Sequence, residues 1–302
     1  MNLHNFKESF YELIEHASIY YNVDEAYIEK DYYVSLLLKE INSRFPYIVF
    51  KGGTSLSKCY KIIDRFSEDI DLTLDVNNQT QSSKKNLKHK IIEVCNELEF
   101  ELLNESQIRS RRDYNCYEIK YPIQFDGIGI KQFLLVETVF MVKSFPDEIK
   151  PVTCMVYDFW KQINDEDAIS EFKMEPFEIR VQTLERTFVD KVFAICDYAV
   201  SNNTTGFSRH IYDLYKLSKY VVLDYAFKNL VNIVREERKK HNRCYTAQDK
   251  YDIPYILKQI IEKNTYYDDY NEVTRKILFD ETSYETAITI INKIIESGVF
   301  EK

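Results

Sequence analysis

Residues 49–75 read VFKGGTSLSKCYKIIDRFSEDIDLTLD, and this stretch decides the fold that we expect. A short apolar strand runs into Gly52-Gly53, and a helix is predicted to follow, with Thr54-Ser55 offering N-cap chemistry. Residues 69–75 then alternate between polar and apolar side chains, which is the period-2 pattern of a strand. The stretch therefore predicts a strand, a glycine turn, a short helix and a second, acidic strand.

The acidic strand and the glycine turn together predict a site for a metal ion and a triphosphate. Asp69 and Asp71 lie at positions i and i+2 of the strand, so they share one face, with Cα atoms roughly 6–7 Å apart. Carboxylate oxygens suit hard divalent cations, Mg²⁺ or Mn²⁺. The backbone N–H groups of a Gly-Gly turn before a helix suit a phosphate, because the helix dipole is positive there.

Each half of this pattern also has an ordinary structural explanation. An Asp-x-Asp pair often lies on the solvated face of a strand, and a Gly-Gly pair precedes many helices. The two halves in this order, with one helix between them, are a more specific signal than either alone. The turn is not a P-loop, because no Gly-Lys-Ser/Thr follows at the required spacing.

Four segments resemble a known family. GGTSLSK at 52–58 and RFSEDIDL at 65–72 resemble the nucleotidyltransferase superfamily with the DNA polymerase β-like fold, in particular the AbiEii/AbiGii toxins and the related MenT toxins of mycobacteria. TLERTFVDKVFA at 183–194 and RHIYDLY at 209–215 are similar to two later motifs of that family.

The resemblance implies roles for two residues of the later motifs. Lys191 would face the nucleotide phosphates, and Asp213 matches the functional aspartate of the last motif. His210 stands where that motif usually has its first aspartate, so the role of this position is open. Independently of the family, Arg209 and Asp213 at i and i+4 would also suit a surface ion pair.

Glu137 is a further candidate, because it interrupts the nearly continuous apolar run at 133–140. A carboxylate in such a strand needs a partner or a metal, so a salt bridge at a sheet edge and metal ligation are both open. In the resembled superfamily a third carboxylate on a neighbouring strand completes the metal site, which favours ligation. Our predicted site residues are therefore as follows: metal ligands Asp69, Asp71 and Glu137; nucleotide-binding Gly52, Gly53, Thr54, Ser55, Lys58 and Lys191; catalytic Asp69, Asp71, Lys191 and Asp213.

The expected fold class is α+β, with a small mixed nucleotidyltransferase sheet flanked by helices and followed by a helical C-terminal domain. We predict a nucleotidyltransferase domain with N-terminal helices at 1–175 and a helical domain at 176–302 that completes the active site. The patterns predict helices within 3–42, with Asp24 as an N-cap, and at 83–100. They predict strands at 101–109, 114–121 and 132–140, and a loop-rich passage at 144–176.

Composition limits the partners and the compartment. The net charge of −9 argues against general coating of nucleic acid, although the basic run at 235–243 is open either as a solvated face or as a surface for an RNA acceptor. No apolar run approaches the ~20 residues of a membrane-spanning helix. The six cysteines form no C-x-x-C pair, which favours reduced thiols in the cytoplasm.

The predicted function is metal-dependent transfer of an NMP from an NTP to an acceptor hydroxyl, with release of pyrophosphate. The resemblance implies that the acceptor is the 3′ end of tRNA. It also implies that the protein is the toxin of a toxin–antitoxin or abortive-infection (phage defence) system, with a cognate antitoxin as its partner. Two alternatives stay open from the residues: a glycosyltransferase whose Asp-x-Asp pair holds the metal of a nucleotide-sugar, and a non-catalytic nucleotide-binding module.

Overall fold

The computed structural model describes residues 2–110, 112–127 and 130–302. The chain forms two compact units, each of which is described here by itself. Unit 1 comprises Met1–Lys61, Ser67–Phe140 and Asp147–Val181, and unit 2 comprises Ile62–Phe66, Met141–Pro146 and Gln182–Lys302. Two short segments of unit 2 therefore lie within the sequence of unit 1. The domain division predicted at 175/176 stays a prediction.

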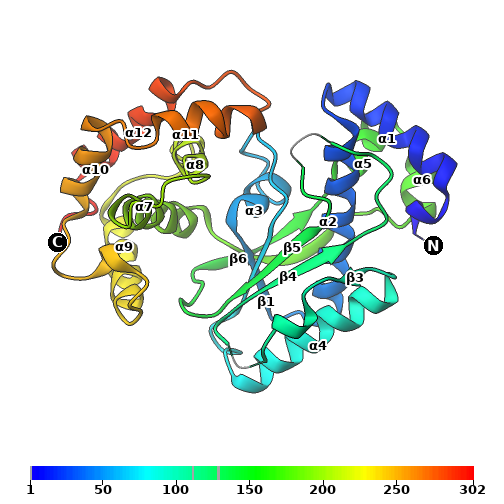
Figure 1. The fold of residues 1–302 in the computed structure, drawn as a ribbon, viewed down its shortest axis with the longest axis horizontal. Helices are drawn as coiled ribbons and strands as arrows, with labels where there is room; N and C mark the ends of the chain where they lie inside the picture. Colours follow the sequence, from blue (N-terminus) through cyan, green and yellow to red (C-terminus); the bar gives the residue numbers. More distant parts are fainter. Residues whose placement is uncertain (1, 111, 128–129) are drawn as a thin grey trace. The chain divides into compact units, whose positions relative to one another are not determined.

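The described residues of unit 1 form a seven-stranded mixed sheet with the strand order β3-β4-β5-β2-β1-β7-β6 (Figure 1). Strands β2 and β5 are parallel, as are β1 and β7, whereas β1 with β2, β3 with β4 and β4 with β5 are antiparallel. The strands are β1 (Ile48–Lys51), β2 (Ile70–Leu74), β3 (Glu101–Leu102), β4 (Tyr114–Lys120), β5 (Leu134–Val139), β6 (Asp147–Val152) and β7 (Phe177–Gln182).

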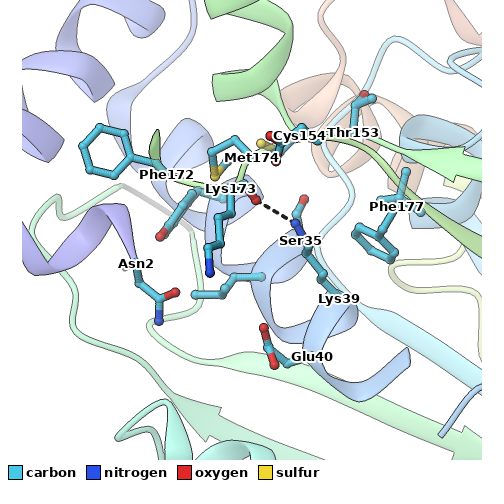
Figure 2. A pocket seen from close by; sticks show the side chains of 14 residues that line it. Asn2, Ser35, Lys39, Glu40, Thr153, Cys154, Phe172, Lys173, Met174 and Phe177 are labelled. Atoms are coloured by element: carbon cyan, nitrogen blue, oxygen red, sulfur yellow. Dashed lines mark hydrogen bonds between the residues drawn. The ribbon is translucent and has the colours of Figure 1, made fainter. Parts of the chain in front are cut away.

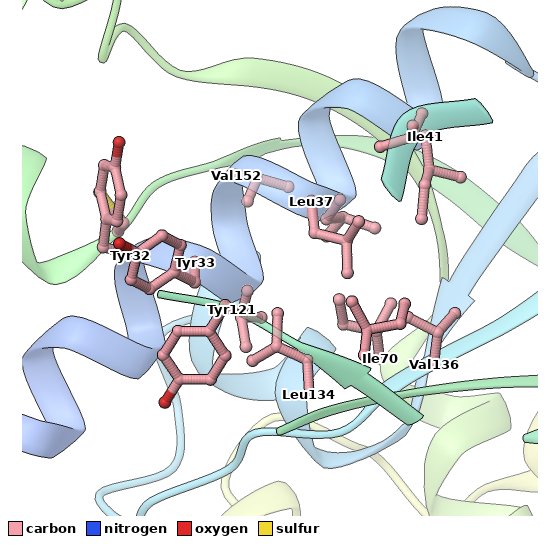
Figure 3. Packing of buried hydrophobic residues seen from close by; sticks show 14 of the residues in the cluster. Tyr32, Tyr33, Leu37, Ile41, Ile70, Tyr121, Leu134, Val136 and Val152 are labelled. Carbon is pink, nitrogen blue, oxygen red and sulfur yellow. The ribbon is translucent and has the colours of Figure 1, made fainter. Parts of the chain in front are cut away.

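The core of unit 1 lies between the sheet and the helices that pack against it. Leu37 and Ile41 of α2 belong to one buried cluster with Ile70 of β2 and Val136 of β5 (Figure 3). Asp24 caps α2, since its side chain accepts a hydrogen bond from Ala26 N at 2.9 Å, as the sequence predicts. The helices of unit 1 are α1 (Lys7–Tyr21), α2 (Glu25–Arg44), α3 (Gly52–Lys58), α4 (Gln81–Glu97), α5 (Met155–Gln162) and α6 (Glu166–Glu171), with 3₁₀ turns at Leu3–Asn5 and Glu105–Gln107.

The acidic strand β2 follows its predicted pattern. Ile70, Leu72 and Leu74 are all fully buried in the core cluster, which contains residues of α2 and α4. Because side chains alternate along a strand, Asp69 and Asp71 project from the opposite face of the sheet. One face of β2 therefore builds the core and the other carries the carboxylates.

Two local predictions are wrong. The segment 101–109 forms a strand only at Glu101–Leu102, and its main-chain pairing ends at Leu103, whose N–H donates to Glu118 O at 2.8 Å. At the next residue the side chain of Asn104 replaces the main chain, donating to Cys116 O at 2.9 Å and accepting from Glu118 N at 3.1 Å. The passage at 144–176, expected to be loop-rich, contains β6, α5 and α6.

Unit 2 is helical, as expected for the C-terminal part of the chain. Helix α7 packs against α8, and α8 packs against α12. The inserted segment Ile62–Phe66 lies beside residues 277–279, with Phe66 N donating to Ile277 O and Phe279 N donating to Asp64 O, both at 2.8 Å. The helices are α7 (Leu184–Val200), α8 (Arg209–Leu217), α9 (Tyr225–Lys239), α10 (Ile253–Glu262), α11 (Tyr267–Glu272) and α12 (Tyr284–Ser297), with 3₁₀ turns at Tyr245–Ala247 and Thr274–Ile277.

The mixed sheet with its helices and the helical C-terminal part confirm the predicted fold class. All six cysteines are free thiols, as the sequence predicts, and five of them are buried. Across the residues that the structure describes, no helix is both long and apolar enough to cross a lipid bilayer.

Candidate functional site

The glycine turn and the acidic strand meet at Gly52. This residue begins α3 directly after β1 and has φ +79°, a conformation that favours glycine. A Cβ atom at Gly52 would lie 2.0 Å from Oδ2 of Asp71, so the carboxylate occupies the space that any larger residue would need. The structure therefore brings together the two halves of the pattern that the sequence places on either side of α3.

The sequence predicts that Thr54 or Ser55 caps α3, and the structure shows that neither does. The N-cap position is Lys51, and no side chain caps the helix from that position. Thr54 Oγ1 lies 2.9 Å from Ser67 Oγ, and Ser55 Oγ donates to Gly52 O at 2.9 Å. Both hydroxyls are thus engaged inside unit 1. What they leave available for a phosphate is the backbone at the start of the helix.

The third predicted carboxylate lies beside the Asp-x-Asp strand. Strands β2 and β5 pair in parallel with Asp71 opposite Glu137, so these side chains project from the same face of adjacent strands, which are about 4.8 Å apart. Tyr114 Oη donates to Glu137 Oε1 at 2.8 Å. Burial, together with this bond, raises the pKa of Tyr114, so its phenol remains a donor that orients the carboxylate.

Asp69 carries a buried acceptor whose hydrogen-bonding capacity is unmet. Its Oδ1 atom is buried and has no hydrogen-bond partner. Such atoms are rare in folded proteins and call for an ion, a water or a functional role. Among the described residues, no three His, Cys, Asp or Glu side chains are close enough to form a metal site. Asp69, Asp71 and Glu137 therefore have the oxygen ligands and the backbone positions that suit a hard divalent cation. Their side chains would have to change rotamer to bind one ion together.

Lys58 has a structural environment. Its side chain is buried, and Nζ donates to Asp31 Oδ1 and Ser35 Oγ at 2.6 Å each and to Asp31 O at 3.1 Å. Since an ammonium group has three hydrogens, these bonds use all of them. The predicted contact of Lys58 with a phosphate stays a prediction, and it requires this network to open.

Unit 2 contains the residues of the two later motifs in one buried cluster. Lys191 Nζ of α7 lies 2.5 Å from Oδ2 of Asp213 on α8. Arg65, from the inserted segment, binds both oxygens of that carboxylate, with Nε 2.7 Å from Oδ1 and Nη2 2.8 Å from Oδ2. Asp213 is fully buried and its partners are these two cations, so the alternative of a surface ion pair with Arg209 is wrong.

The charges in this cluster determine its protonation. Burial opposes ionisation of Asp213, but Arg65 and Lys191 outweigh that effect and hold the pKa of its carboxyl well below the usual range. His210 Nδ1 lies 3.5 Å from Lys191 Nζ. Burial, reinforced by Lys191 and Arg209, lowers the pKa of His210 well below its ordinary value, so the ring is neutral at pH 7. A neutral imidazole therefore stands where the resembled motif has a carboxylate.

Sequence reasoning missed Arg65. Its local signals were its place as the first residue of the RFSEDIDL segment and the charged pair Asp64-Arg65 between apolar neighbours, and neither indicates a role. The bidentate contact joins residues 148 positions apart in the chain, and no local pattern encodes such a pairing.

Part of the basic run at 235–243 is structural. Arg235 is buried, and its Nη2 donates to Phe300 O at 2.7 Å. Arg238 Nη2 lies 2.8 Å from Asp197 Oδ2. These two arginines therefore stabilise unit 2. They belong neither to a solvated face nor to a surface for RNA, the two alternatives that the sequence left open for this run.

A pocket of about 130 Å³ lies elsewhere in unit 1, between α2 and the segment that leads into β7 (Figure 2). Ser35, Lys39 and Met174 are among the residues that line it, and Lys39 Nζ donates across it to Lys173 O at 2.7 Å. None of the predicted site residues lines this pocket.

Comparison with known families identifies the family of the chain. A sequence model of the family described as nucleotidyl transferase AbiEii toxin, type IV TA system, matches residues 36–290. The chain belongs to this family. The match includes the glycine turn, both carboxylate strands and the cluster around Asp213. No curated protein matches the chain.

Membership of the AbiEii family confirms three expectations from the sequence. The chain is an NTP-dependent nucleotidyltransferase, and it is the toxin of a toxin–antitoxin system. A toxin of such a system has an antitoxin as its counterpart.

Proposed function

We propose that this AbiEii toxin transfers an NMP from an NTP to the hydroxyl at the 3′ end of a tRNA, with a bound divalent cation. The observation that carries the proposal is the approach of Asp71 Oδ2 to Gly52, in register with Glu137 on the neighbouring strand. It supports a single site in unit 1 in which phosphate-binding backbone adjoins paired carboxylates.

In unit 1, Asp69, Asp71 and Glu137 would hold Mg²⁺ or Mn²⁺. Such an ion, when bound, neutralises phosphate charge and lowers the pKa of an attacking hydroxyl. The backbone of Gly52-Gly53 and of the first turn of α3 would bind the outer phosphates. Thr54 and Ser55 would contribute through their backbone, because their hydroxyls are bonded internally.

In unit 2, Lys191 would supply positive charge to the phosphates as pyrophosphate leaves. Asp213 would orient Lys191, which is consistent with the 2.5 Å contact between them. The tRNA acceptor is proposed from the resemblance of these motifs to the MenT toxins. A glycosyltransferase is less well supported, because it gives the glycine turn no role, whereas the turn contacts the Asp-x-Asp strand.

The proposal is tested by incubating the protein with each labelled NTP, total tRNA and Mg²⁺, Mn²⁺ or EDTA. We expect one NTP to label tRNA only when a divalent cation is present. Asp69→Asn should lower labelling by about 100-fold or more, the scale seen when one preorganised electrostatic group is removed. Its melting temperature should stay close to that of the wild type, since Oδ1 has no hydrogen bond to lose.

A matched control is Asp75→Asn, at the end of the same strand, because Asp75 binds the backbone of the following turn. Its labelling should remain at the wild-type level. Full labelling by Asp69→Asn, or labelling that survives EDTA, would refute the proposed site. Labelling of an RNA other than tRNA would refute the acceptor and leave nucleotidyl transfer intact.

A further inference from the structure

Two cations converge on one buried carboxylate in unit 2. Arg65 and Lys191 are 4% and 5% exposed, and both bind the single carboxylate of Asp213. The neighbouring His210 contributes no negative charge. Arg65 and Lys191 therefore share the oxygens of one buried carboxylate, in a setting where charges interact strongly.

Arg65 is held in place from several directions. Its Nη1 donates to Phe66 O at 2.8 Å, while Nε and Nη2 bind the two oxygens of Asp213. Its backbone pairs with Leu278 in an antiparallel bridge. The N–H of the neighbouring Asp64 donates to Tyr212 Oη at 3.1 Å, and Tyr212 directly precedes Asp213 on α8. The guanidinium is therefore fixed relative to the carboxylate that it binds.

We propose that Arg65 is a positioning residue that neutralises and orients Asp213, so that Asp213 holds Lys191 in place without cancelling its charge. This inference rests on the proposed function, which assigns the charge of Lys191 to the phosphates of the NTP. Arg65 itself touches neither the NTP nor the acceptor in this scheme.

The physical argument is one of competition for a carboxylate. If Arg65 were absent, Asp213 and Lys191 would form a one-to-one pair, and their fields would largely cancel at an approaching phosphate. With Arg65 present, the Asp213 charge is already compensated, and the Lys191 charge remains for the anion. Arginine suits this task because its planar fork donates to both carboxylate oxygens at once, which an ammonium group cannot do.

The test measures the dissociation constant of the preferred NTP for the full chain, with Mg²⁺, by isothermal titration calorimetry. Arg65→Met should weaken binding about tenfold, the scale of one charge-assisted interaction, and Arg65→Lys about threefold. Adding Asp213→Asn to Arg65→Met should restore most of the lost affinity, because the neutral amide no longer cancels Lys191. Labelling should remain low in the double variant, since the amide no longer fixes Lys191.

The matched control is Arg238→Met, which also removes an arginine of unit 2 that is paired with an aspartate. Both methionine variants should lower the melting temperature, but Arg238→Met should keep wild-type affinity for the NTP. A merely structural Arg65 would make the two variants behave alike.

Wild-type affinity in Arg65→Met, or no recovery when Asp213→Asn is added, would overturn the inference. If Arg65→Met does not fold, Arg65→Lys decides in its place, and an unchanged dissociation constant overturns the inference. A wild-type protein that neither binds NTP nor labels tRNA would refute the proposed function itself. Binding and labelling by the wild type with an unaffected Arg65→Met would refute only the role of Arg65.

Discussion

Gly52 must be glycine for two reasons, its positive φ and the close approach of the Asp71 carboxylate. An alanine at this position, with φ of +79°, would destabilise the folded state by roughly 1–2 kcal/mol. Its Cβ atom would also lie 2.0 Å from Asp71 Oδ2, so the carboxylate would have to move. We therefore expect Gly52→Ala to fold with a lowered melting temperature and to lose at least about tenfold in tRNA labelling, because the carboxylate is moved.

Gly206→Ala is the matched control for that prediction. Gly206 has φ +81°, but no atom lies within 4 Å of the position of its Cβ. It should show a similar loss of thermal stability with unchanged labelling. Equal loss of labelling in the two variants would mean that backbone strain, and not the displacement of Asp71, accounts for the effect.

The sequence predicts residues of the site where a local pattern places them. Strand alternation predicted that Asp69 and Asp71 share one face of the strand. The resemblance to the superfamily predicted a third carboxylate on a neighbouring strand, and Glu137 lies opposite Asp71 there. Arg65 and Lys58 were not predictable in the same way. Lys58 is bound by Asp31, 27 residues earlier, and Arg65 by a residue far later in the chain, so their environments depend on tertiary packing.

At the scale of elements, strands and helices with a strong periodic pattern were predictable and their ends were less so. Strand β2 and the cap of α2 at Asp24 agree with expectation. Helix α3 begins two residues earlier than its expected cap at Thr54, because positive φ at Gly52 turns the chain directly out of β1. The strand expected at 101–109 is cut short by the side chain of Asn104, whose bonds no periodicity reveals.

Helix α2 contains a carboxyl group that links stability to pH. Burial raises the pKa of Glu29 from 4.5 to about 7, although Gln124 N and Phe125 N both donate to it. Between these pH values the folded state binds more protons than the unfolded state. The free energy of unfolding should therefore fall as pH rises from about 4.5 to 7, by at most roughly 3 kcal/mol.

Glu29→Gln should flatten this part of the pH profile, because an amide does not titrate. Urea unfolding followed by circular dichroism at pH 5 and pH 7.5 measures the difference. Glu12→Gln, at an exposed position of α1, serves as the control and should keep the wild-type profile. A variant at Glu29 with the wild-type profile would assign the pH dependence to other groups.

At the scale of the whole molecule, the two units are interleaved in sequence. Ile62–Phe66 and Met141–Pro146 belong to unit 2, although they lie between segments of unit 1. This division was not predictable from composition, because no linker or change of residue type marks those segments. It arises from long-range contacts such as that of Lys216 Nζ with Asp64 Oδ2 at 2.7 Å.

A chain that ends at Val181 should therefore fail to fold cooperatively. It would contain Ile62–Phe66 without the partners that this segment has on α8, and loss of a buried ion-pair partner costs about 3–5 kcal/mol out of a typical 5–15 kcal/mol. Thermal melting followed by circular dichroism compares the fragment with the full chain. A sharp transition of the fragment near the melting temperature of the full chain would contradict this expectation.

The bond between Arg65 and Asp213 also has a consequence for synthesis on the ribosome. The two residues are 148 positions apart in the chain. At a translation rate of 5–20 residues per second, Asp213 is therefore added roughly 7–30 s after Arg65. Products of premature termination before codon 213 cannot assemble this cluster. Under the proposed function, the toxin therefore becomes active only after residue 213 has been translated.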